Sequence, residues 1–585
     1  MIVPMKKVTL FCREEDQKTT LHTLQKKGIL HVTHVNPPHC DGLEKARSDY
    51  NRLGNVLGVL SSIAATNAGM QDRPAHEITA NVETLIERKK ELDELQEKLK
   101  REQSLLQPFG HFEPAHITAL TDKGVYIRLC RVPVKEAVVT PPGVFLHVLN
   151  KDKQYLYFVI MGNSQFTCGY EELKLLAYSL AEVEQKISHT AEELHSIQES
   201  LTTWSNYKNV LIKAFREAKE KIALLEVMTG MGCAEKIVYL QGYCPADRAG
   251  EIQQETARQG WGVIAADPGE DDDVPTLIQS PKWVQPIRTV FAMINILPGY
   301  REVDISSVFL IFFSIFTALL IGDAGYGGLF LVLTFVARKK FPKAPSAPFT
   351  LIGILSLGSI VWGVVTGNYF GIAVIPTPFA KLRINWLGND KNLINLCFMI
   401  GAIHLSVAHV WNAVRIINSA RAIAQLGWIG MTWTMYLAAR SMILDATFPS
   451  WGYLLVVASF VALIFFQVSP KKIKKDWPDL MMMPLNVIGN FVDVVSYIRL
   501  FAVGSASLAV AMNFNEMALG HGVPTILAGL IAAVILLLGH VLNIALVALG
   551  ILVHGVRLNT LEFSGHIGVQ WKGIRYNPFC MEHNN

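Results

Sequence analysis

The chain has 585 residues, of which 51% are hydrophobic and 17% are charged, and its formal net charge is +4. Charged residues are dense up to about residue 282, whereas apolar runs of membrane-spanning length dominate from about 303 to 560. This asymmetry excludes a plain soluble enzyme, a wholly disordered protein and a pure membrane bundle. The small net charge does not favour nucleic-acid binding, so we expect no nucleic-acid partner.

The charge-rich half opens and closes with the same short pattern of elements. Residues 5–35 predict a strand, a helix and a strand, and residues 237–265 repeat that order. Because the two segments stand at opposite ends of one stretch of chain, we expect them to meet in space. The sequence therefore predicts a proximal globule formed by residues 1–50 and 235–285.

Two long helical stretches, 76–107 and 170–230, lie between these segments and carry apolar residues at spacings of three and four. That heptad pattern predicts a coiled coil. Three strand-like segments between residues 124 and 162 predict a distal globule over 108–165. We expect an antiparallel coiled-coil hairpin capped by small α/β globules, and we favour an intramolecular strut over a dimerisation rod.

The first half carries no pattern typical of an active site. Its sequence contains no P-loop, no glycine-rich dinucleotide turn and no metal-ligand spacing, so we expect no catalytic activity, cofactor or metal. The eight cysteines of the chain are scattered, with no C-x-x-C pair, and the first residues lack the apolar core of a signal peptide. Residues 1–285 are therefore expected in the cytoplasm.

Apolar segments from residue 303 to 565 predict a mainly α transmembrane domain, entered through a linker over 286–302 and followed by a cytoplasmic tail over 566–585. Basic clusters at 338–343 and 471–475 then lie on the same side as the first half, as the positive-inside rule requires. We expect a multi-pass protein with both termini in the cytoplasm. The eight expected helices lie near 303–321, 324–338, 349–370, 394–417, 423–444, 450–468, 484–518 and 524–560.

Arg499 stands near the middle of the seventh expected helix, and residues 494–512 contain no other charge. A charged side chain at bilayer depth is expensive and normally faces protein or water, where it has a function. A structural ion pair or a side chain that reaches the interface is the alternative, and the mid-helix position disfavours it. Helical spacing places Ser496 and Asn513 on the same stripe as Arg499.

Arg557 lies at the end of the last expected helix, on a stripe with Asn543 and His554 and close to Glu562. An arginine near a cytoplasmic helix end is often an interface anchor, and Glu562 could be its salt-bridge partner. The functional and structural readings therefore have similar weight here. Further polar groups in the apolar half are Asp323, His404, His409, Asp493, Glu516 and His540, of which Asp323 could cap a helix or line an aqueous entry.

Several motifs resemble one known family, the membrane stator subunit (a or I) of V-type and A-type rotary ATPases, in its prokaryotic form. The resemblance covers nearly the whole chain, and its most specific part is the pair of arginine motifs in the matching helices. The motifs are KKVTLF (6–11), YLQGYCP (239–245), DVPTLI (273–278), GYREVD (299–304), GDAGYG (322–327), VVSYIRLFAV (494–503), GHVLNIALVALGILVHGVRLNTLEF (539–563) and YNPF (576–579).

This resemblance implies two half-channels for H⁺ or Na⁺ beside a proteolipid ring in the prokaryotic plasma membrane. It implies that Arg499 faces the ring carboxylate, that Arg557 supports it, and that Glu562 lies near the cytoplasmic access path. The soluble arm would bind peripheral stalks of the E/G type and, through the stalks, the ATPase head. A central-stalk adaptor of the ring would be a further partner. The half-channel or supporting residues would be Asp323, Asp493, Ser496, Ser507, Asn513, Glu516, His540, Asn543 and His554.

The sequence also departs from the family pattern. Eukaryotic relatives place a histidine eight residues after the first arginine and an acid ten residues before the second, where this chain has Ser507 and Val547, and Ile305 replaces an expected proline. The residues that would form the outer ion route are therefore not assigned by the resemblance. An autonomous secondary transporter and a receptor with a dimerising rod are the alternatives. The stator reading fails if Arg499 points into lipid, or is held by an acid of its own chain far from any rotor.

Overall fold

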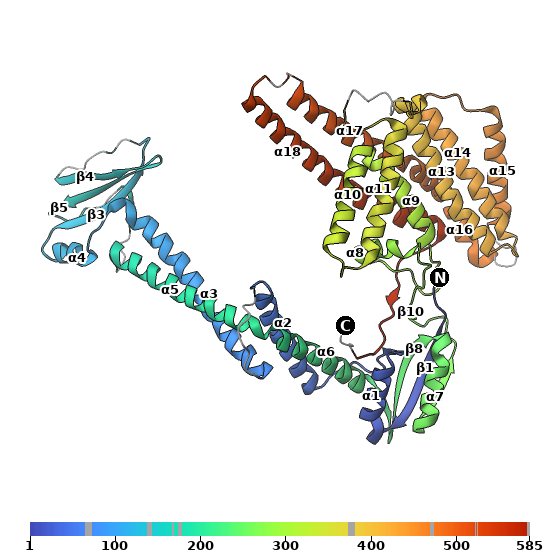
Figure 1. Ribbon diagram of the computed structural model, residues 1–585, viewed down its shortest axis with the longest axis horizontal. Coiled ribbons are helices and arrows are strands. Elements are labelled where there is room, and N and C mark those ends of the chain that lie inside the picture. Colours follow the sequence, from blue (N-terminus) through green and yellow to red (C-terminus); the bar gives the residue numbers. More distant parts are fainter. Residues whose placement is uncertain are drawn as a thin grey trace. The chain divides into compact units, whose positions relative to one another are not determined.

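The computed structural model describes residues 1–64, 73–136, 138, 143–166, 169–173, 178–372, 381–467, 473–520, 522 and 524–581. The protein is mainly helical, and its two larger sheets lie in the first half (Figure 1). Two compact units make up the chain. The first consists of Met1–Thr9, Ile29–His31 and Gly242–Pro578, and the second of Leu10–Gly28, Val32–Gln241 and the chain from Phe579.

The two ends of the charge-rich half contribute alternating strands to one sheet. Its order is β2–β8–β1–β9, so each strand of one segment neighbours a strand of the other. A left-handed glycine ends each of the two short helices, Gly28 after α1 and Gly260 after α7, because that backbone conformation is strained for other residues. The bounds are β1 Met5–Arg13, α1 Gln17–Lys27, β2 His31–Thr33, β7 Gly232–Ala234, β8 Ile237–Pro245, α7 Ala249–Gln259 and β9 Gly262–Ala266.

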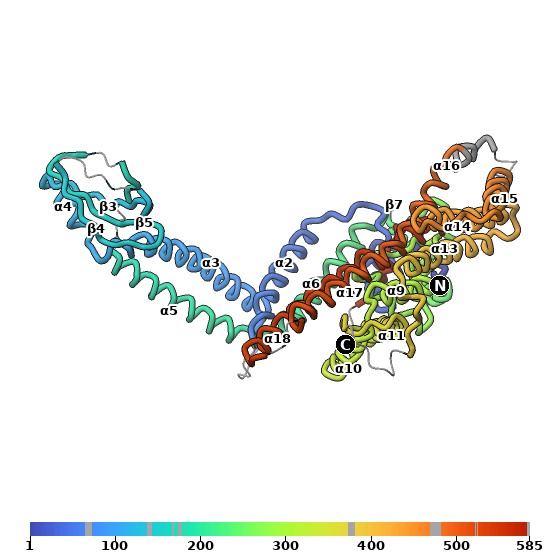
Figure 2. The backbone as a smooth tube through the Cα atoms, turned by 90° about the horizontal axis from the view of Figure 1, so that it is seen from above, coloured from blue at the N-terminus to red at the C-terminus, as the bar shows by residue number. Residues whose placement is uncertain are grey.

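Three long helices occupy the expected heptad stretches, with differences in extent. Helices α3 (Ala75–Leu106) and α5 (Leu180–Trp204) run side by side, as Figures 1 and 2 show, and bury Leu99, Leu106, Leu180 and Val183 between them. The predicted helix over 170–230 is wrong in two respects. It begins only at Leu180, and a 3₁₀ turn at Ser205–Tyr207 separates α5 from α6 (Lys208–Gly230). The unpredicted helix α2 (Asp41–Ser61) packs along α6.

A four-stranded sheet occupies the stretch between α3 and α5. Its order is β4–β5–β3–β6, and all its pairs are antiparallel. The start of the expected helix over 170–230 falls here instead, because Glu171 and Glu172 pair with Arg131 and Cys130 of β3. The bounds are α4 Pro114–Asp122, β3 Tyr126–Pro133, β4 Val144–Lys151, β5 Tyr155–Gly162 and β6 Glu171–Glu172, so the three strand-like segments of the sequence are strands.

The chain end is not a free tail. Strand β11 (Ile574–Arg575) pairs in parallel with β10 (Pro275–Thr276), and Gly573 N donates to Leu297 O at 2.9 Å. The Trp571 ring packs edge-on against Phe291, 5.5 Å between centroids, in helix α8 (Arg288–Met293). Residues 571–575 of the expected cytoplasmic tail over 566–585 therefore pack on the segment that leads to the apolar helices, and the cytoplasmic location of the tail stays a prediction.

All eight expected apolar segments are helical, and the seventh is two helices that meet at Tyr497. Among the described residues, four segments are long and apolar enough to cross a membrane: Ser346–Thr366, Asp390–Arg415, Met481–Leu519 and Ile526–Ile567. The number of eight crossings stays a prediction. The helices are α9 Ser306–Ile321, α10 Ala324–Lys340, α11 Ser346–Thr366, α13 Asp390–Arg415, α14 Arg421–Leu444, α15 Ser450–Phe466, α16 Ile473–Ser496, α17 Ile498–Leu519 and α18 Ile526–Gly550.

The last long helix changes its winding near its end. After α18 the chain forms π-helical turns at Ile551–Gly555 and Leu558–Phe563 and a final turn α19 (Ser564–Ile567), which stops at the left-handed Gly568. π-turns bond each residue to the fifth one along and are frequent at functional sites. Helices α17 and α18 pack against each other, and α17 also contacts α9 and α13.

Candidate functional site

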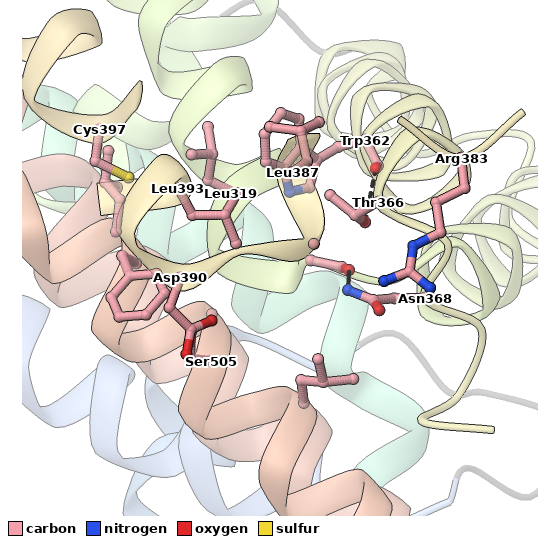
Figure 3. Close-up of a pocket in the computed structure, with 16 residues that line it drawn as sticks. Leu319, Trp362, Thr366, Asn368, Arg383, Leu387, Asp390, Leu393, Cys397 and Ser505 are labelled. Carbon is pink, nitrogen blue, oxygen red and sulfur yellow. Dashed lines mark hydrogen bonds between the residues drawn. The ribbon is translucent and has the colours of Figure 1, made fainter. Parts of the chain in front are cut away.

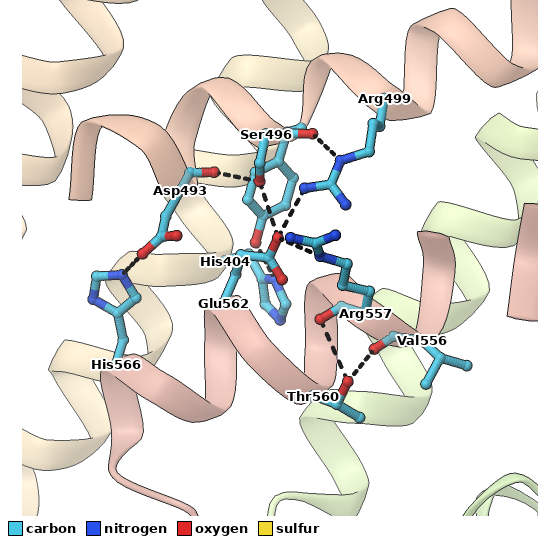
Figure 4. A network of polar contacts seen from close by, with 10 residues as sticks. His404, Asp493, Ser496, Arg499, Val556, Arg557, Thr560, Glu562 and His566 are labelled. Carbon is cyan, nitrogen blue, oxygen red and sulfur yellow. Dashed lines mark hydrogen bonds and ion pairs between the residues drawn. The ribbon is translucent and has the colours of Figure 1, made fainter. Parts of the chain in front are cut away.

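Arg499 is the second residue of α17, directly after the break at Tyr497. Its Nη2 donates to Glu562 Oε1 at 3.0 Å and its Nε donates to Ser496 O at 3.2 Å (Figure 4). The side chain is 24% exposed, and its buried Nη1 has no hydrogen-bond partner among the described residues. Two guanidinium nitrogens of Arg499, Nε and Nη2, are therefore bonded within the chain, and Nη1 can still donate to another group.

Glu562 connects the two arginines of the apolar half. Its carboxylate is 5% exposed, and Oε1 lies 3.7 Å from Arg557 Nε as well as 3.0 Å from Arg499 Nη2. Ser496 Oγ donates to the same oxygen at 3.3 Å, whereas the buried Oε2 has no partner among the described residues. One carboxylate thus faces two guanidinium groups, which leaves the cluster with one positive charge in excess.

The π-helical turns explain how Arg557 and Glu562 meet. Residues five apart on an α-helix differ by about 140° around the axis and do not face each other. A π-turn brings the fifth residue back toward the first, because its hydrogen bonds run from i to i+5. The turn Leu558–Phe563 therefore brings Glu562 to the side of Arg557. The structural reading of Arg557, a salt bridge to Glu562, is confirmed as geometry.

A chain of polar side chains leads away from this cluster toward α13 and α14. His566 Nε2 lies 3.0 Å from Asp493 Oδ2, and His566 Nδ1 lies 2.9 Å from His409 Nε2. His409 Nδ1 is in turn 2.9 Å from Gln425 Oε1. A cavity of about 390 Å³ is lined by these residues together with Glu562 and Asn490. We call it the inner cavity.

A second cavity, of about 150 Å³, lies among α9, α11, α13 and α17 (Figure 3). Its polar lining includes Asn368, Arg383, Asp390 and Ser505, and Leu500 and Gly504 of α17 also border it. We call it the outer cavity. The sequence reasoning did not single out Arg383 or Asp390, because both fall in a connecting segment where charge carries no signal of burial.

A third space, of about 430 Å³, is a groove along the contact of α17 and α18. Its lining is mostly apolar and includes the small residues Ala502, Ala506 and Gly550, and its polar members are Ser507, Asn543 and His554. Small side chains allow another helix to approach closely in a membrane. The groove therefore presents a surface on which a neighbouring helix can pack.

Asp323 has the cap role that the sequence left open. It is 3% exposed, and its Oδ1 accepts from the amides of Gly325 at 2.7 Å and Tyr326 at 3.1 Å, at the start of α10. Its Oδ2 accepts from Gly371 N at 3.2 Å. Both carboxylate oxygens of Asp323 therefore accept hydrogen bonds from backbone amides of the same chain.

Other predicted site residues lie apart from the arginine cluster. Asn513 and Glu516 are exposed further along α17, and His404 is a buried core group that bonds to Tyr497 Oη at 2.7 Å. His540 and Asn543 join a separate network with Tyr326, at 2.6 and 3.0 Å from its Oη. Tyr326 and His566 are the site residues that sequence reasoning missed. No group of three metal-ligating side chains occurs in the part of the chain that the structure describes.

Comparison with known proteins adds an independent result. No family model matches the chain. V-type ATP synthase subunit I of Borreliella burgdorferi is 30% identical over 616 residues, which cover 99% of each chain. The chain belongs to the subunit I family of V-type and A-type ATP synthases. Subunit I 1 of the V-type ATP synthase of Treponema pallidum is 28% identical over 99% of this chain and 100% of its own length.

One solved structure also matches this member of the subunit I family. The crystal structure of the cytoplasmic N-terminal domain of subunit I, homolog of subunit a, of V-ATPase covers 44% of this chain and 99% of that one. The sequence identity is 16% and the TM-score is 0.23, a value too low to support an argument about the fold. Family membership makes the chain one subunit of a rotary ATPase complex, which contains other subunits.

Proposed function

We propose that this subunit I is the stator of ion translocation: it provides half-channels for H⁺ or Na⁺ beside a proteolipid ring and couples ion flow to ATP hydrolysis or synthesis. The observation that carries the proposal is Arg499, which keeps one buried nitrogen unpaired in a cluster that holds two guanidinium groups and one carboxylate. Such a cluster attracts one further carboxylate, and an acid on the ring is the expected partner.

The chemistry of arginine suits this role. A guanidinium stays protonated at any working pH, so it keeps its charge while a partner gains and loses an ion. Beside a ring carboxylate it stabilises the ionised form and favours release of the bound ion. Its fixed charge also repels a cation that would cross directly between the half-channels. The ion then has to travel with the ring and delivers about 2.3 kcal/mol per charge per 100 mV.

The proposal would fail if an acid of the same chain held Arg499 far from any rotor. Arg499 does bond to an acid of the same chain, Glu562. The remaining question is whether Arg499 lies where a rotor helix can approach it. Arg499 lies one turn before Val503, which lines the α17–α18 groove. The small residues of this groove allow a partner helix to pack closely. Glu562 also shares its charge with Arg557, so it neutralises Arg499 only in part.

The two polar cavities support a pair of half-channels. The inner cavity includes Asp493 and Glu562, and the outer cavity borders α17 from Leu500 onward, so that Arg499 stands between them along the chain. A half-channel needs only polar lining and water. Ser496, Ser507, Asn543, His540 and His554 would line or support the two half-channels. Asn513 and Glu516, being exposed, would at most line the outer entrance.

We also propose the wider assembly that the sequence suggests. Residues 1–285 would form a cytoplasmic stator arm, a coiled-coil hairpin with a globule at each end. This arm would bind peripheral stalks of the E/G type and, through them, the ATPase head, while the central-stalk adaptor would sit on the ring. Eight crossings would place both termini in the cytoplasm. The basic residues Arg338, Lys339 and Lys340 at the end of α10 support this orientation.

The test is ATP-driven ion pumping by the whole purified complex in liposomes, with Arg499→Ala in subunit I. We expect pumping to be lost while the subunits still copurify, and Arg499→Lys to restore only part of it. Arg440→Ala, in an exposed position of α14, is the matched control and should pump normally. Normal pumping by Arg499→Ala would refute the proposal. Transport by the isolated subunit in liposomes would favour an autonomous transporter instead.

A further inference from the structure

A buried tyrosine connects three helices at a point eight residues beyond Arg499 along α17. Tyr326, in the first turn of α10, places its Oη 2.6 Å from Nδ1 of His540 on α18. Asn543, one turn further on α18, donates from Nδ2 to the same Oη at 3.0 Å and to Ser507 O of α17 at 3.1 Å. These contacts form one continuous polar path through an apolar helix interface.

The tyrosine hydroxyl is held in place from several sides. Tyr326 is 3% exposed and Asn543 is fully buried, whereas His540 is partly exposed. Asp323 fixes the backbone of Tyr326, and the Phe370 ring packs edge-on against the rings of Tyr326 and His540, at 5.2 and 6.0 Å between centroids. The path therefore runs from a partly exposed imidazole to a buried amide.

The Asn543 end of the path adjoins the α17–α18 groove, and the His540 end is partly exposed. The outer cavity approaches this network only through Gly322, next to the Asp323 cap of α10. Asn543 and Ser507 line the α17–α18 groove, and the buried Oδ1 of Asn543 has no partner among the described residues. An unpaired buried acceptor is costly, so Asn543 offers a site for a donor in the groove.

We infer that Tyr326 and His540 form a proton-transfer pair between the outer side and the α17–α18 groove, and that Asn543 positions the proton acceptor on the groove side. This inference rests on the proposed function, because it names residues of the outer half-channel. It assigns a route in the region where Ser507 and Val547 stand in place of a titratable histidine and acid.

The transfer conserves protons. In the tautomer of His540 that carries hydrogen on Nδ1, Nε2 accepts a proton from water on the outer side. The Nδ1 proton then passes to Tyr326 Oη, and the hydroxyl proton of Tyr326 leaves to a water molecule, which the unpaired Oδ1 of Asn543 would hold on the groove side. Rotation of the hydroxyl and a change of tautomer restore the pair. One proton enters and one leaves, and the direction reverses with the gradient.

A purely structural tie between helices is the competing explanation. The chain contains such a tie, since His404 bonds to Tyr497 Oη at 2.7 Å, but both of those residues are fully buried among Phe312, Phe316 and Phe563. His540 differs because it is partly exposed. A structural tie predicts that lost activity follows lost assembly, whereas a transfer pair predicts that pumping alone is lost.

The experiment measures ATP-driven proton uptake and subunit content of the whole complex in liposomes for Tyr326→Phe, His540→Gln and His540→Ala. We expect each variant to assemble and to pump at least about tenfold more slowly, which is the lower end of what a lost proton-transfer group costs. Imidazole added on the outer side should restore pumping by His540→Ala but not by Tyr326→Phe. Tyr453→Phe, which removes a hydroxyl from an exposed residue of α15, is the matched control.

Each outcome separates the two proposals. Normal pumping by Tyr326→Phe together with loss in Arg499→Ala overturns the transfer pair and leaves the stator function standing. Normal pumping by both overturns both. Slow pumping that imidazole does not relieve, accompanied by reduced subunit content, assigns the cluster to structure alone. Sodium pumping that is insensitive to an uncoupler would also overturn the pair, because a tyrosine hydroxyl transfers protons and not metal cations.

Discussion

The carboxylate of Glu562 accepts a hydrogen bond from Arg499 at 3.0 Å, and this contact ties the start of α17 to the π-helical end of α18. The acid is 5% exposed and the arginine 24%. Removing one partner of a buried ion pair leaves an uncompensated charge, which costs far more than the net stabilisation of the pair. Arg557 contacts the same oxygen, so the loss of any one of the three charged groups would change the charge balance around the other two.

Glu562→Gln should therefore lower the stability and activity of the complex because it removes the negative charge while it keeps the size of the side chain. The amide keeps the size of the side chain but places two arginines beside a neutral group, at a cost of about 3 kcal/mol. We expect a lower thermal midpoint of the complex and slower pumping. Glu199→Gln, which changes an acid of α5 that is 71% exposed, should change neither. Equal behaviour of the two variants would show that the charge of Glu562 is not needed.

Close backbone approach sets the position of α17. A Cβ on Gly504 would lie 2.5 Å from Leu319 O of α9, a distance that requires the helices to separate. Overpacking of this kind costs about 1–3 kcal/mol and would displace the helix that carries Arg499. Gly504→Ala should reduce coupled pumping and thermal stability together. Gly328→Ala on α10, where nothing lies within 4 Å of the added carbon, should be silent.

The arginines and Glu562 were predictable because charge stands out in apolar sequence. The salt bridge of Arg557 to Glu562 was one of two interpretations of the sequence, but the contact of Arg499 with the same acid was not predicted, because 63 residues separate them. The geometry of the first contact was not predictable either, because Arg557 and Glu562 are five residues apart, a spacing that faces opposite sides in an α-helix. Only the π-turn Leu558–Phe563 brings them together. No side-chain pattern in the sequence predicts such a turn. The sequence therefore identified the two arginines and Glu562 but not how they are arranged.

The missed residues show a second limit. Tyr326 stands in a glycine-rich turn, where an aromatic ring reads as packing, and its role depends on His540, which is 214 residues away. His566 falls in a segment that reads as a polar tail, yet it bonds to Asp493. The elements of the charge-rich half were easier to predict from the sequence, because heptads and alternating strands are local patterns. Its error, the helix over 170–230, arose where a two-residue strand pairs with a distant partner.

A salt bridge outside the apolar helices gives a pH-dependent prediction. Lys7 Nζ lies 2.8 Å from Asp272 Oδ1, and this hydrogen bond, with that from Gly269 N, holds the pKa of Asp272 below its usual value. The same bond raises the pKa of Lys7. The carboxylate contribution is therefore present above pH of about 4 and is lost as pH falls through the lowered pKa. The lysine contribution is present below about 10.4 and is lost as pH rises through the raised pKa.

Asp272→Asn should lower the thermal midpoint between these limits, by an amount that corresponds to no more than about 1 kcal/mol. The difference from the unmodified protein should vanish at acid pH, where the carboxylate of the unmodified protein is protonated. Thermal unfolding followed at a series of pH values measures it. Asp267→Asn, whose carboxylate is 84% exposed, is the control and should show a smaller difference. A difference that persists unchanged in acid would contradict the assignment.

The ordered chain end gives the last prediction, because Trp571 joins it to the helices. Its ring packs edge-on against Phe291 and Phe309, 5.5 and 6.5 Å between centroids, and its Nε1 donates to Thr560 O at 3.2 Å. Trp571→Ala removes the ring and the hydrogen bond, for which we expect a loss of about 3 kcal/mol. Trp451→Ala, at a position that is 61% exposed on α15, should cost much less. Thermal unfolding of the purified complex compares the two, and an equal effect would mean that the chain end adds nothing to the stability of the helices it touches.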